Sequence, residues 1–231
     1  MIPFFDYKQI FNNNKKNFEK IFNDVSSKGA FIMQEELQKF EKNLSKYHGI
    51  KYALGVGNAT DAMELLLIAN DVKRGSEIIF CSHTMTATAS AIKFAGAEPV
   101  PVNCNEEYLL DYNDLKNKIN SRTKGVFVTH LNGRIADMNE IKDICKKKNI
   151  EIYEDAAQAL GAKYKGEFAG TMGLAGTISF YPAKTLGSFG DAGAILTNDK
   201  ELYDKMRFAR AYSHAVLSVQ HRSNLTCNLD Q

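Results

Sequence analysis

The chain has 231 residues, enough for one substantial domain with a large buried core. Its 29 basic and 27 acidic side chains leave a net charge of +2, so the composition indicates neither nucleic acid nor an anionic membrane as a partner. The four cysteines are far apart and form no C-x-x-C pair, which argues against a zinc site and a disulfide framework. The sequence has neither a signal-peptide pattern nor an apolar run of membrane-spanning length, and we therefore expect a cytoplasmic protein without a metal.

Two helices are expected before the first strand. Apolar residues between Phe18 and Val25 recur at helical spacing and predict an amphipathic helix that stops at Gly29. A second helix is expected from Gln34 to Tyr47, with Gly49 close behind it as a terminator.

Short apolar runs then alternate with helical stretches, which indicates an α/β domain with a mostly parallel sheet covered by helices on both faces. Near Ala175 the rhythm changes, because two strands follow each other with only a loop between them. We expect one domain that extends to about residue 212. The expected strands are Tyr52–Val56, Glu77–Cys81, Pro99–Val102, Lys124–Thr129, Ile150–Glu154, Gly176–Tyr181 and Ala192–Thr197, and the helices between and after them are Ala62–Ala69, Thr86–Phe94, Leu115–Ile119, Met138–Lys146 and Lys200–Tyr212.

Ligands of such sheets bind beyond the carboxyl ends of the strands, so the residues after each strand are the candidates for a site. The first strand leads into Gly57-Asn58-Ala59-Thr60, at the start of a helix whose first N–H groups have no helical partners. Such a turn can seat a phosphate, and Thr60 could add its hydroxyl. Two alternatives remain open. Asn58 and Thr60 could merely cap the helix, or the turn could be a dinucleotide fingerprint, although Thr60 stands where its third glycine would fall.

Two further segments carry side chains suited to chemistry. Asp155 ends a strand and would favour a cationic partner such as a protonated pyridine nitrogen, and the alternative is that it caps a short following helix. Gln158 would lie near the same face of a helical turn and could hydrogen-bond a ring hydroxyl. Lys184 stands in a glycine-rich loop after a strand that includes Ser179. A lysine in such a loop usually decorates the surface, but in a pocket its amine could act as a nucleophile.

These three segments, in this order, resemble the DegT/DnrJ/EryC1/StrS aminotransferases, and the resemblance covers residues 1 to about 212. It implies the three-layer α-β-α large domain of the aspartate-aminotransferase (type I) fold, which binds pyridoxal 5'-phosphate (PLP). It also implies that Lys184 forms a Schiff base with PLP, that Asp155 keeps the pyridine nitrogen protonated, and that Gln158 faces the ring or its hydroxyl. By the same resemblance, the phosphate would be held by Asn58, Ala59, Thr60 and Ser179.

The sequence departs from the family at several positions. Met85 stands where an aromatic residue usually stacks on the pyridine ring, and Asn132 stands where an aromatic residue is common. Ala59 replaces the usual glycine of the phosphate turn and would add strain if its φ were positive. Gln34 replaces another frequent glycine. In the family a small C-terminal domain follows, whereas residues 213–231 here are expected to form an atypical tail, with the small domain absent.

The family transfers an amino group from glutamate to a nucleotide-linked keto sugar, which implies a role in amino-sugar, cell-surface polysaccharide or lipopolysaccharide biosynthesis. It also implies a homodimer, since the phosphate site of the family is completed by the neighbouring subunit. The segment from Ser179 to Lys184 and the turn Gly190-Asp191-Ala192-Gly193 look more like those of enzymes that act on 3-keto than on 4-keto sugars. Tyr181 could set how deeply the hexose enters, or could simply pack in the core.

Other functions remain open. A truncated or degenerate relative could bind PLP or form dimers without catalysis, and we expect little transaminase activity from this chain alone. A family-related sugar dehydratase carries histidine in place of the lysine, so Lys184 counts against that reading. The sequence supports a dinucleotide-binding oxidoreductase less well, because the glycine fingerprint of that class is incomplete here.

Overall fold

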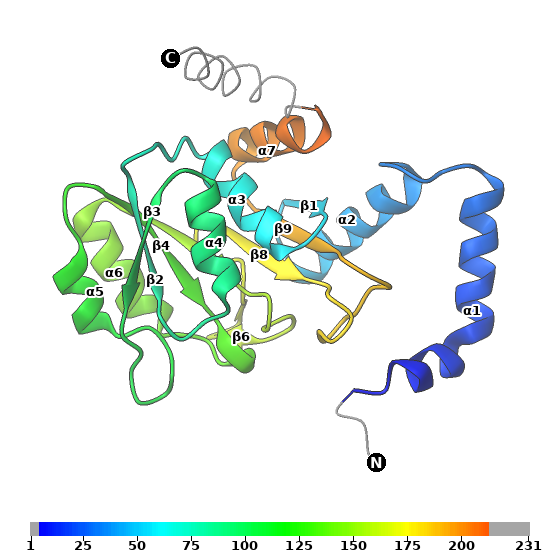
Figure 1. The fold of residues 1–231 in the computed structure, drawn as a ribbon, viewed down its shortest axis with the longest axis horizontal. Helices are drawn as coiled ribbons and strands as arrows, with labels where there is room; N and C mark the ends of the chain where they lie inside the picture. Colours follow the sequence, from blue (N-terminus) through cyan, green and yellow to red (C-terminus); the bar gives the residue numbers. More distant parts are fainter. Residues whose placement is uncertain (1–4, 213–231) are drawn as a thin grey trace, which may run out of the picture.

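Residues 5–212 are described in the computed structural model of the chain, and a seven-stranded sheet runs through their centre (Figure 1). Its strands are β1 Tyr52–Val56, β2 Glu77–Cys81, β3 Glu98–Val102, β4 Thr123–Thr129, β5 Glu151–Asp155, β8 Ala175–Ser179 and β9 Gly193–Thr197. They lie in the order β1-β9-β8-β5-β4-β2-β3. β9 is antiparallel to both of its neighbours, and all other neighbouring pairs are parallel. The carboxyl ends of the six parallel strands therefore meet at one edge of the sheet.

One face of the sheet is covered by α3 (Ala59–Ala69), α4 (Thr86–Phe94) and α7 (Lys200–Tyr212). Leu66 of α3 and Ile92 of α4 belong to the same buried cluster as Phe127 and Tyr153 of the sheet. Successive side chains of a strand point to opposite faces, so Asp155, two residues after Tyr153, points toward this layer as well.

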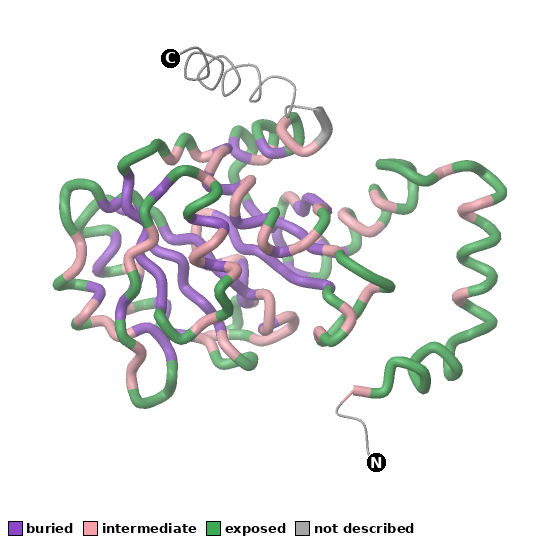
Figure 2. The backbone as a smooth tube through the Cα atoms, viewed as in Figure 1, coloured by how far each residue is buried: buried purple, intermediate pink, exposed green. Residues whose placement is uncertain are grey.

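The other face is covered by α2 (Glu35–His48), α5 (Tyr112–Lys118) and α6 (Met138–Lys148). Ile141 of α6 packs in one cluster with Val128 of β4 and Ile152 of β5, while Leu44 of α2 packs over β8 and β9. The strands lie buried between the two helical layers (Figure 2). In β2, β8 and β9 every residue is buried, as expected for strands covered on both faces. The expected three-layer α/β architecture is therefore confirmed.

The N-terminal helix α1 (Tyr7–Ser27) stands away from the sheet and has no buried residue (Figures 1 and 2). It begins well before Phe18, because Asp6 caps it by accepting a hydrogen bond from the N–H of Gln9 at 2.9 Å. Its contact with the domain includes an aromatic cluster, in which the Phe18 ring lies 4.7 Å from the ring of Phe189. The amphipathic stripe of α1 is thus only partly covered by this chain.

The expected order of elements is confirmed, with differences at several boundaries. α3 begins at Ala59 rather than at Ala62, because Asn58 caps it. β8 ends at Ser179 rather than at Tyr181, since the N–H of Tyr181 turns back to Oγ of Ser179 at 3.2 Å. The sequence analysis missed a two-stranded hairpin, β6 (Lys163–Tyr164) with β7 (Glu167–Phe168).

Residues 213–231, the expected tail, lie outside the described residues. Within residues 5–212, no helix combines the length and the apolar character needed to cross a bilayer.

Candidate active site

The turn between β1 and α3 lies at the carboxyl edge of the sheet. Asn58 does cap α3: its Oδ1 accepts the N–H of Asp61 at 2.8 Å, and its Nδ2 donates to Oδ2 of Asp61 at 2.9 Å. Ala59 and Thr60 follow as the first helical residues, and N–H groups at this position have no carbonyl partner within the helix. Capping and anion binding are therefore compatible in this turn.

Gly193, the first residue of β9, packs closely against this turn. A Cβ atom at Gly193 would lie 2.5 Å from the carbonyl carbon of Asn58 and 2.9 Å from the nitrogen of Ala59, so the close approach requires glycine. Ala59 is not among the described residues with positive φ, and the strain considered for an alanine at this position is absent. Gly193 pairs with Val56 on one side and with Ser179 on the other, which brings the β1 turn and Ser179 to the same place.

Ser179 ends β8 and is 7% exposed. Its Oγ accepts the N–H of Tyr181, so its own hydroxyl hydrogen remains available to donate to an anion. Thr60 is half-buried in the first turn of α3, directly after Asn58 and Ala59, whose main-chain atoms pack against Gly193. Two hydroxyl groups and a helix N-terminus therefore surround one small region at the edge of the sheet.

Asp155 ends β5 with its carboxylate buried on the α4 side. Oδ2 accepts the hydroxyl of Thr88 at 2.9 Å, and Oδ1 accepts the N–H of Ala157 at 3.2 Å. Burial raises the pKa of the Asp155 carboxyl above its usual value, while these hydrogen bonds and the positive charges of His130 and Lys184 act in the opposite direction. No helix follows Asp155, so the alternative that it caps one is wrong.

Lys184 lies in the loop between β8 and β9. Its N–H donates to the carbonyl of Tyr181 at 2.8 Å, and the residue is half-buried. The loop folds back on itself, because Oγ of Ser188 lies 2.7 Å from the carbonyl oxygen of Phe180 and 2.6 Å from that of Gly190. The positive charge of Lys184 is one of the influences that lower the pKa of the buried Asp155 carboxyl, against the larger effect of burial.

Gln158 faces the segment that follows β4. Its Oε1 accepts the N–H of Asn132 at 3.1 Å, but residues 156–161 form turns rather than the expected helical turn. Asn132 has a φ of 54°, a left-handed conformation that asparagine adopts more readily than an aromatic residue. Met85 caps α4 and is 65% exposed, and Tyr181 is 52% exposed. The alternative that Tyr181 packs in the core is therefore wrong.

The described residues fit PLP. A buried carboxylate whose pKa is raised by burial gains from a cationic neighbour, as a protonated pyridine nitrogen would be. A helix N-terminus with two hydroxyl groups suits a phosphate. Lys184 supplies a half-buried amine-bearing side chain in the loop that follows Ser179.

Three buried polar residues around Asp155 had no expected role: Thr88, His130 and Glu154. Thr88 lies on the apolar side of a helix, where a hydroxyl carries no sequence signal of its own. Glu154 did offer a signal, because two adjacent acidic residues at the end of an apolar strand must point to opposite faces of a buried sheet.

Comparisons with known proteins agree with this fold. The family model of the DegT/DnrJ/EryC1/StrS aminotransferase family matches residues 12–226. A dTDP-3-amino-3,6-dideoxy-alpha-D-galactopyranose transaminase of Aneurinibacillus thermoaerophilus is 42% identical over 213 residues, covering 92% of this chain and 59% of the relative. The S. venezuelae DesV structure, in complex with a ketimine intermediate, superposes with a TM-score of 0.88 at 36% identity, covering 91% of this chain and 57% of that one.

A putative sugar aminotransferase from Streptococcus pneumoniae, solved in its PLP form, superposes with a TM-score of 0.73 at 26% identity and covers 76% of this chain and 50% of that one. The chain thus spans roughly half to two thirds of the length of the proteins it matches.

Proposed function

Because the chain belongs to the DegT/DnrJ/EryC1/StrS aminotransferase family, we propose that it is the PLP-binding part of an enzyme that transfers an amino group to a nucleotide-linked keto sugar. The observation that carries this proposal is the buried carboxylate of Asp155 at the end of β5, at the same carboxyl edge of the sheet as the half-buried Lys184, which follows β8. Such a pair suits a ligand that has a cationic ring nitrogen and a carbonyl group that reacts with an amine.

Each site residue has a role in this proposal. Lys184 would hold PLP through its side-chain amine, and the same amine would carry a proton to and from the substrate. Asp155 accepts the N–H of the ring nitrogen and keeps it protonated. Gln158 and Met85 border the ring. The phosphate is held by Asn58, Ala59, Thr60 and Ser179. PLP, when bound, supplies the electron-withdrawing ring that carries the amino group between donor and acceptor.

Glutamate is the proposed amino donor, and a 3-keto nucleotide sugar is the proposed acceptor. The Aneurinibacillus relative is named for a 3-amino sugar, which supports C3 over C4. Tyr181 is exposed three residues before Lys184, where its ring can limit the depth of hexose entry. To test this, the chain is joined to the C-terminal domain of a close relative and assayed with matched 3-keto and 4-keto nucleotide sugars. Faster amination of the 4-keto sugar would remove the C3 proposal.

A homodimer is part of the same proposal. An apolar groove of about 650 Å³ lies between α1 and the loop that contains Phe189. Ile21, Phe22 and Phe31 of this region are 59%, 70% and 71% exposed, and a second copy would cover them. Sedimentation equilibrium is the test: a dimer mass is expected, and a monomer mass at high protein concentration would contradict the proposal.

A second candidate is a chain that binds PLP or forms dimers without turnover. This candidate is favoured because the chain spans only 59% of the Aneurinibacillus relative and 57% of the DesV chain. We propose that residues 1–212 are the PLP-binding large domain, with the N-terminal helices as part of it. Amino transfer would then be slow in this chain, because the remaining part of the relatives is needed to orient the substrate.

The proposal is tested by adding PLP to the purified chain and recording its absorbance spectrum. We expect a new band from lysine-bound PLP in the wild type and in Lys148→Ala, a control lysine on α6. The band should be absent in Lys184→Ala. If the wild-type spectrum is only the sum of the spectra of free PLP and of the protein, the proposed function is contradicted. The same result would contradict the candidate that binds PLP without turnover.

A further inference from the structure

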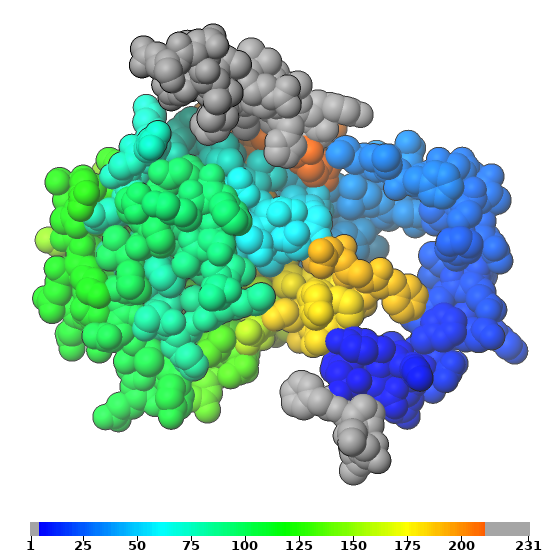
Figure 3. All heavy atoms as spheres, viewed as in Figure 1, coloured from blue at the N-terminus to red at the C-terminus, as the bar shows by residue number. Residues whose placement is uncertain are grey.

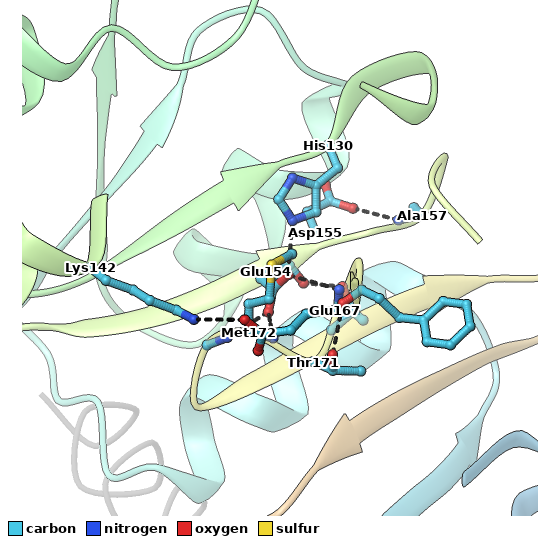
Figure 4. Close-up of polar contacts among 12 residues, drawn as sticks. His130, Lys142, Glu154, Asp155, Ala157, Glu167, Thr171 and Met172 are labelled. Carbon is cyan, nitrogen blue, oxygen red and sulfur yellow. Dashed lines mark hydrogen bonds and ion pairs between the residues drawn. The ribbon is translucent and has the colours of Figure 1, made fainter. Parts of the chain in front are cut away.

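Among residues 5–212, two acidic side chains each meet a basic side chain with both partners largely buried. Glu154 meets His130 at the end of β5, where Nε2 of His130 lies 2.9 Å from Oε2 of Glu154 (Figure 4). Glu41 of α2 meets Arg210 of α7 beside β1, and these two side chains are 14% and 15% exposed. The second pair joins two helices that are far apart in the sequence, on the strand that leads into the turn at Asn58.

Both side chains of this second pair bind the main chain of Gly55. Oε1 of Glu41 accepts the N–H of Gly55 at 2.8 Å, and Nη1 of Arg210 donates to the carbonyl oxygen of Gly55 at 3.0 Å. Nη1 also donates to the same Oε1 of Glu41. Nε of Arg210 is buried without a partner among the described residues, and the bonds that join Arg210 to α2 and β1 both come from Nη1. We call Glu41 and Arg210 the edge clamp of Gly55.

The edge clamp holds a side of β1 that no other strand holds. β1 lies at the edge of the seven-stranded sheet, with β9 as its neighbour. In an antiparallel pair every second residue directs its N–H and C=O groups away from the partner strand, and Gly55 is such a residue. α2 packs directly on this position, since a Cβ atom on Gly55 would lie 2.7 Å from Cδ1 of Leu37 and 3.5 Å from Oε1 of Glu41.

The clamped residue lies close to the turn that begins α3. Gly55 precedes Asn58 by three residues, and the next residue, Val56, pairs with Gly193, which packs against the main chain of Asn58. β1 is therefore held by β9 on one side and by the edge clamp on the other, just before this turn. N–H groups at a helix start bind a phosphate only when they point at it, because hydrogen bonds weaken steeply when they are misaligned. A displacement of β1 at Gly55 would move these donors.

We propose that Glu41 and Arg210 are positioning residues for the phosphate of PLP: by holding both main-chain groups of Gly55, they keep the turn at Asn58 in the place that binds it. Neither side chain is assigned a contact with the cofactor. This inference rests on the proposed function, because the phosphate is that of PLP. An ion pair with a purely structural role would change the stability of the chain and leave its preference for a phosphate group unchanged.

The first test compares PLP with pyridoxal, which has the same ring and aldehyde but no phosphate. The variant is Glu41→Leu/Arg210→Met, which removes the edge clamp without leaving a lone buried charge, and such apolar replacement of a buried ion pair is often neutral for stability. We expect the ratio of PLP affinity to pyridoxal affinity to fall by about tenfold, since the phosphate loses its fixed donors while the ring contacts remain. An unchanged ratio would overturn the inference, whatever the stability of the variant.

Arg207→Met is the matched control. Arg207 lies one turn before Arg210 on α7, is exposed, and lines the groove between α2, β1 and α7. Its replacement removes the same charge from the same helix and leaves the edge clamp in place, so the affinity ratio should equal that of the wild type. A fall as large as that of the double variant would show that loss of positive charge is the cause, and would overturn the inference.

The second test needs no PLP and uses inorganic phosphate as the probe. Nitrogen-15 NMR of the cofactor-free chain follows the main-chain N–H signals of Ala59 and Thr60 as phosphate is added. We expect both signals to shift in the wild type, and the double variant to need about tenfold more phosphate for the same shift. Equal phosphate concentrations at half-shift, or no shift of either signal in the wild type, would overturn the inference.

The two proposals fail in distinguishable ways. If the wild-type chain binds no PLP, the proposed function fails, while the titration with inorganic phosphate still decides the role of the edge clamp. Urea denaturation identifies any variant that does not fold. If the double variant does not fold, Glu41→Gln takes its place, because it keeps the shape of the side chain and removes only the charge that holds Arg210. A wild-type ratio of PLP to pyridoxal affinity in Glu41→Gln would then overturn the inference.

Discussion

The hydroxyl of Thr88 donates a hydrogen bond of 2.9 Å to Oδ2 of Asp155, and so joins α4 to the end of β5. The Thr84 hydroxyl lies 3.1 Å from that of Thr88, and the Thr129 hydroxyl donates to Thr84 at 3.3 Å. A chain of hydroxyl groups from three elements therefore ends on the carboxylate. These hydroxyl groups donate hydrogen bonds but add no charge of their own. They therefore orient the Asp155 carboxylate and favour its ionised form.

We predict that Thr88→Val weakens PLP binding by about tenfold. A hydrogen bond to a charged group contributes roughly 1.5 to 3 kcal/mol, and bound PLP would compensate for part of its loss. PLP titration followed by absorbance measures the effect. Thr197→Val is the control, because Thr197 is also buried and donates a single hydrogen bond of 2.8 Å, but to the carbonyl of Leu174. Equal PLP affinity in Thr88→Val and Thr197→Val would contradict this role of Thr88.

Asp155→Asn should stabilise the cofactor-free chain at pH 8. The pKa of the Asp155 carboxyl is raised by burial above its usual value of 3.8, so the folded state binds the proton more tightly than the unfolded state does. The stabilising contribution of the group is therefore present at low pH and is lost as the pH rises through the raised pKa. Asparagine avoids this loss, and we therefore expect Asp155→Asn to unfold at a higher urea concentration than the wild type at pH 8.

Urea denaturation over a range of pH measures this gain, which should shrink as the pH falls through the raised pKa of the Asp155 carboxyl and the wild-type group becomes protonated in the folded state. PLP binding by Asp155→Asn should be strongly weakened throughout this range. A variant that is less stable than the wild type at pH 8 would show that the buried carboxylate stabilises the cofactor-free fold.

Gly193→Ala should displace the turn at Asn58 and Ala59. The added Cβ would meet main-chain atoms at 2.5 to 2.9 Å, which cannot move without shifting the start of α3. We expect destabilisation by about 1 to 3 kcal/mol and a loss of PLP affinity. Gly57→Ala is the matched control in the same turn, since its Cβ would meet only Oδ2 of the flexible Asp61 side chain, at 2.9 Å. Urea denaturation and PLP titration should both show a larger loss in Gly193→Ala than in Gly57→Ala. A larger loss in Gly57→Ala would refute the packing argument.

The sequence predicted the sheet well because its strands are continuous apolar runs, bounded by helices with clear periodicity. β1, β2 and α4 have the expected bounds, and the change of rhythm near Ala175 corresponds to the antiparallel strand β9. The hairpin of β6 and β7 was missed because two-residue strands carry no periodicity, although Lys165-Gly166, both with positive φ, form its turn.

The site was predictable where a residue follows a strand, and not where its partner comes from a distant element. Asp155 and Ser179 are the last residues of strands and Lys184 follows one, and the order of the sheet brings these strand ends to one edge. Thr88 and His130 act on Asp155 from 67 and 25 residues away along the chain, as their numbers show. Their contribution depends on the packing of α4 and on the pairing of β4 with β5, which no local pattern encodes.

The shape of the molecule also bears on the homodimer. In the space-filling view, the N-terminal helix lies to one side of the sheet domain, with an opening between them along part of its length (Figure 3). We predict that Phe22→Lys, which introduces a charge on the exposed apolar stripe of α1, shifts the protein to a monomer at micromolar concentration. Lys20→Glu, also on α1, is the control for a change of charge alone. Sedimentation velocity measures both, and a dimer that persists in Phe22→Lys would exclude this stripe from the interface.

The central claim is that Lys184 is the residue that bonds to PLP. Its most direct test is to incubate the chain with PLP, reduce the mixture with sodium borohydride, digest it and locate the pyridoxyl group by mass spectrometry. A carbon–nitrogen double bond between lysine and PLP is converted by borohydride into a stable single bond, which survives digestion. The account predicts stoichiometric modification of Lys184 and only traces on the other lysines. A chain left unmodified, or modified on exposed lysines in proportion to their accessibility, would contradict it.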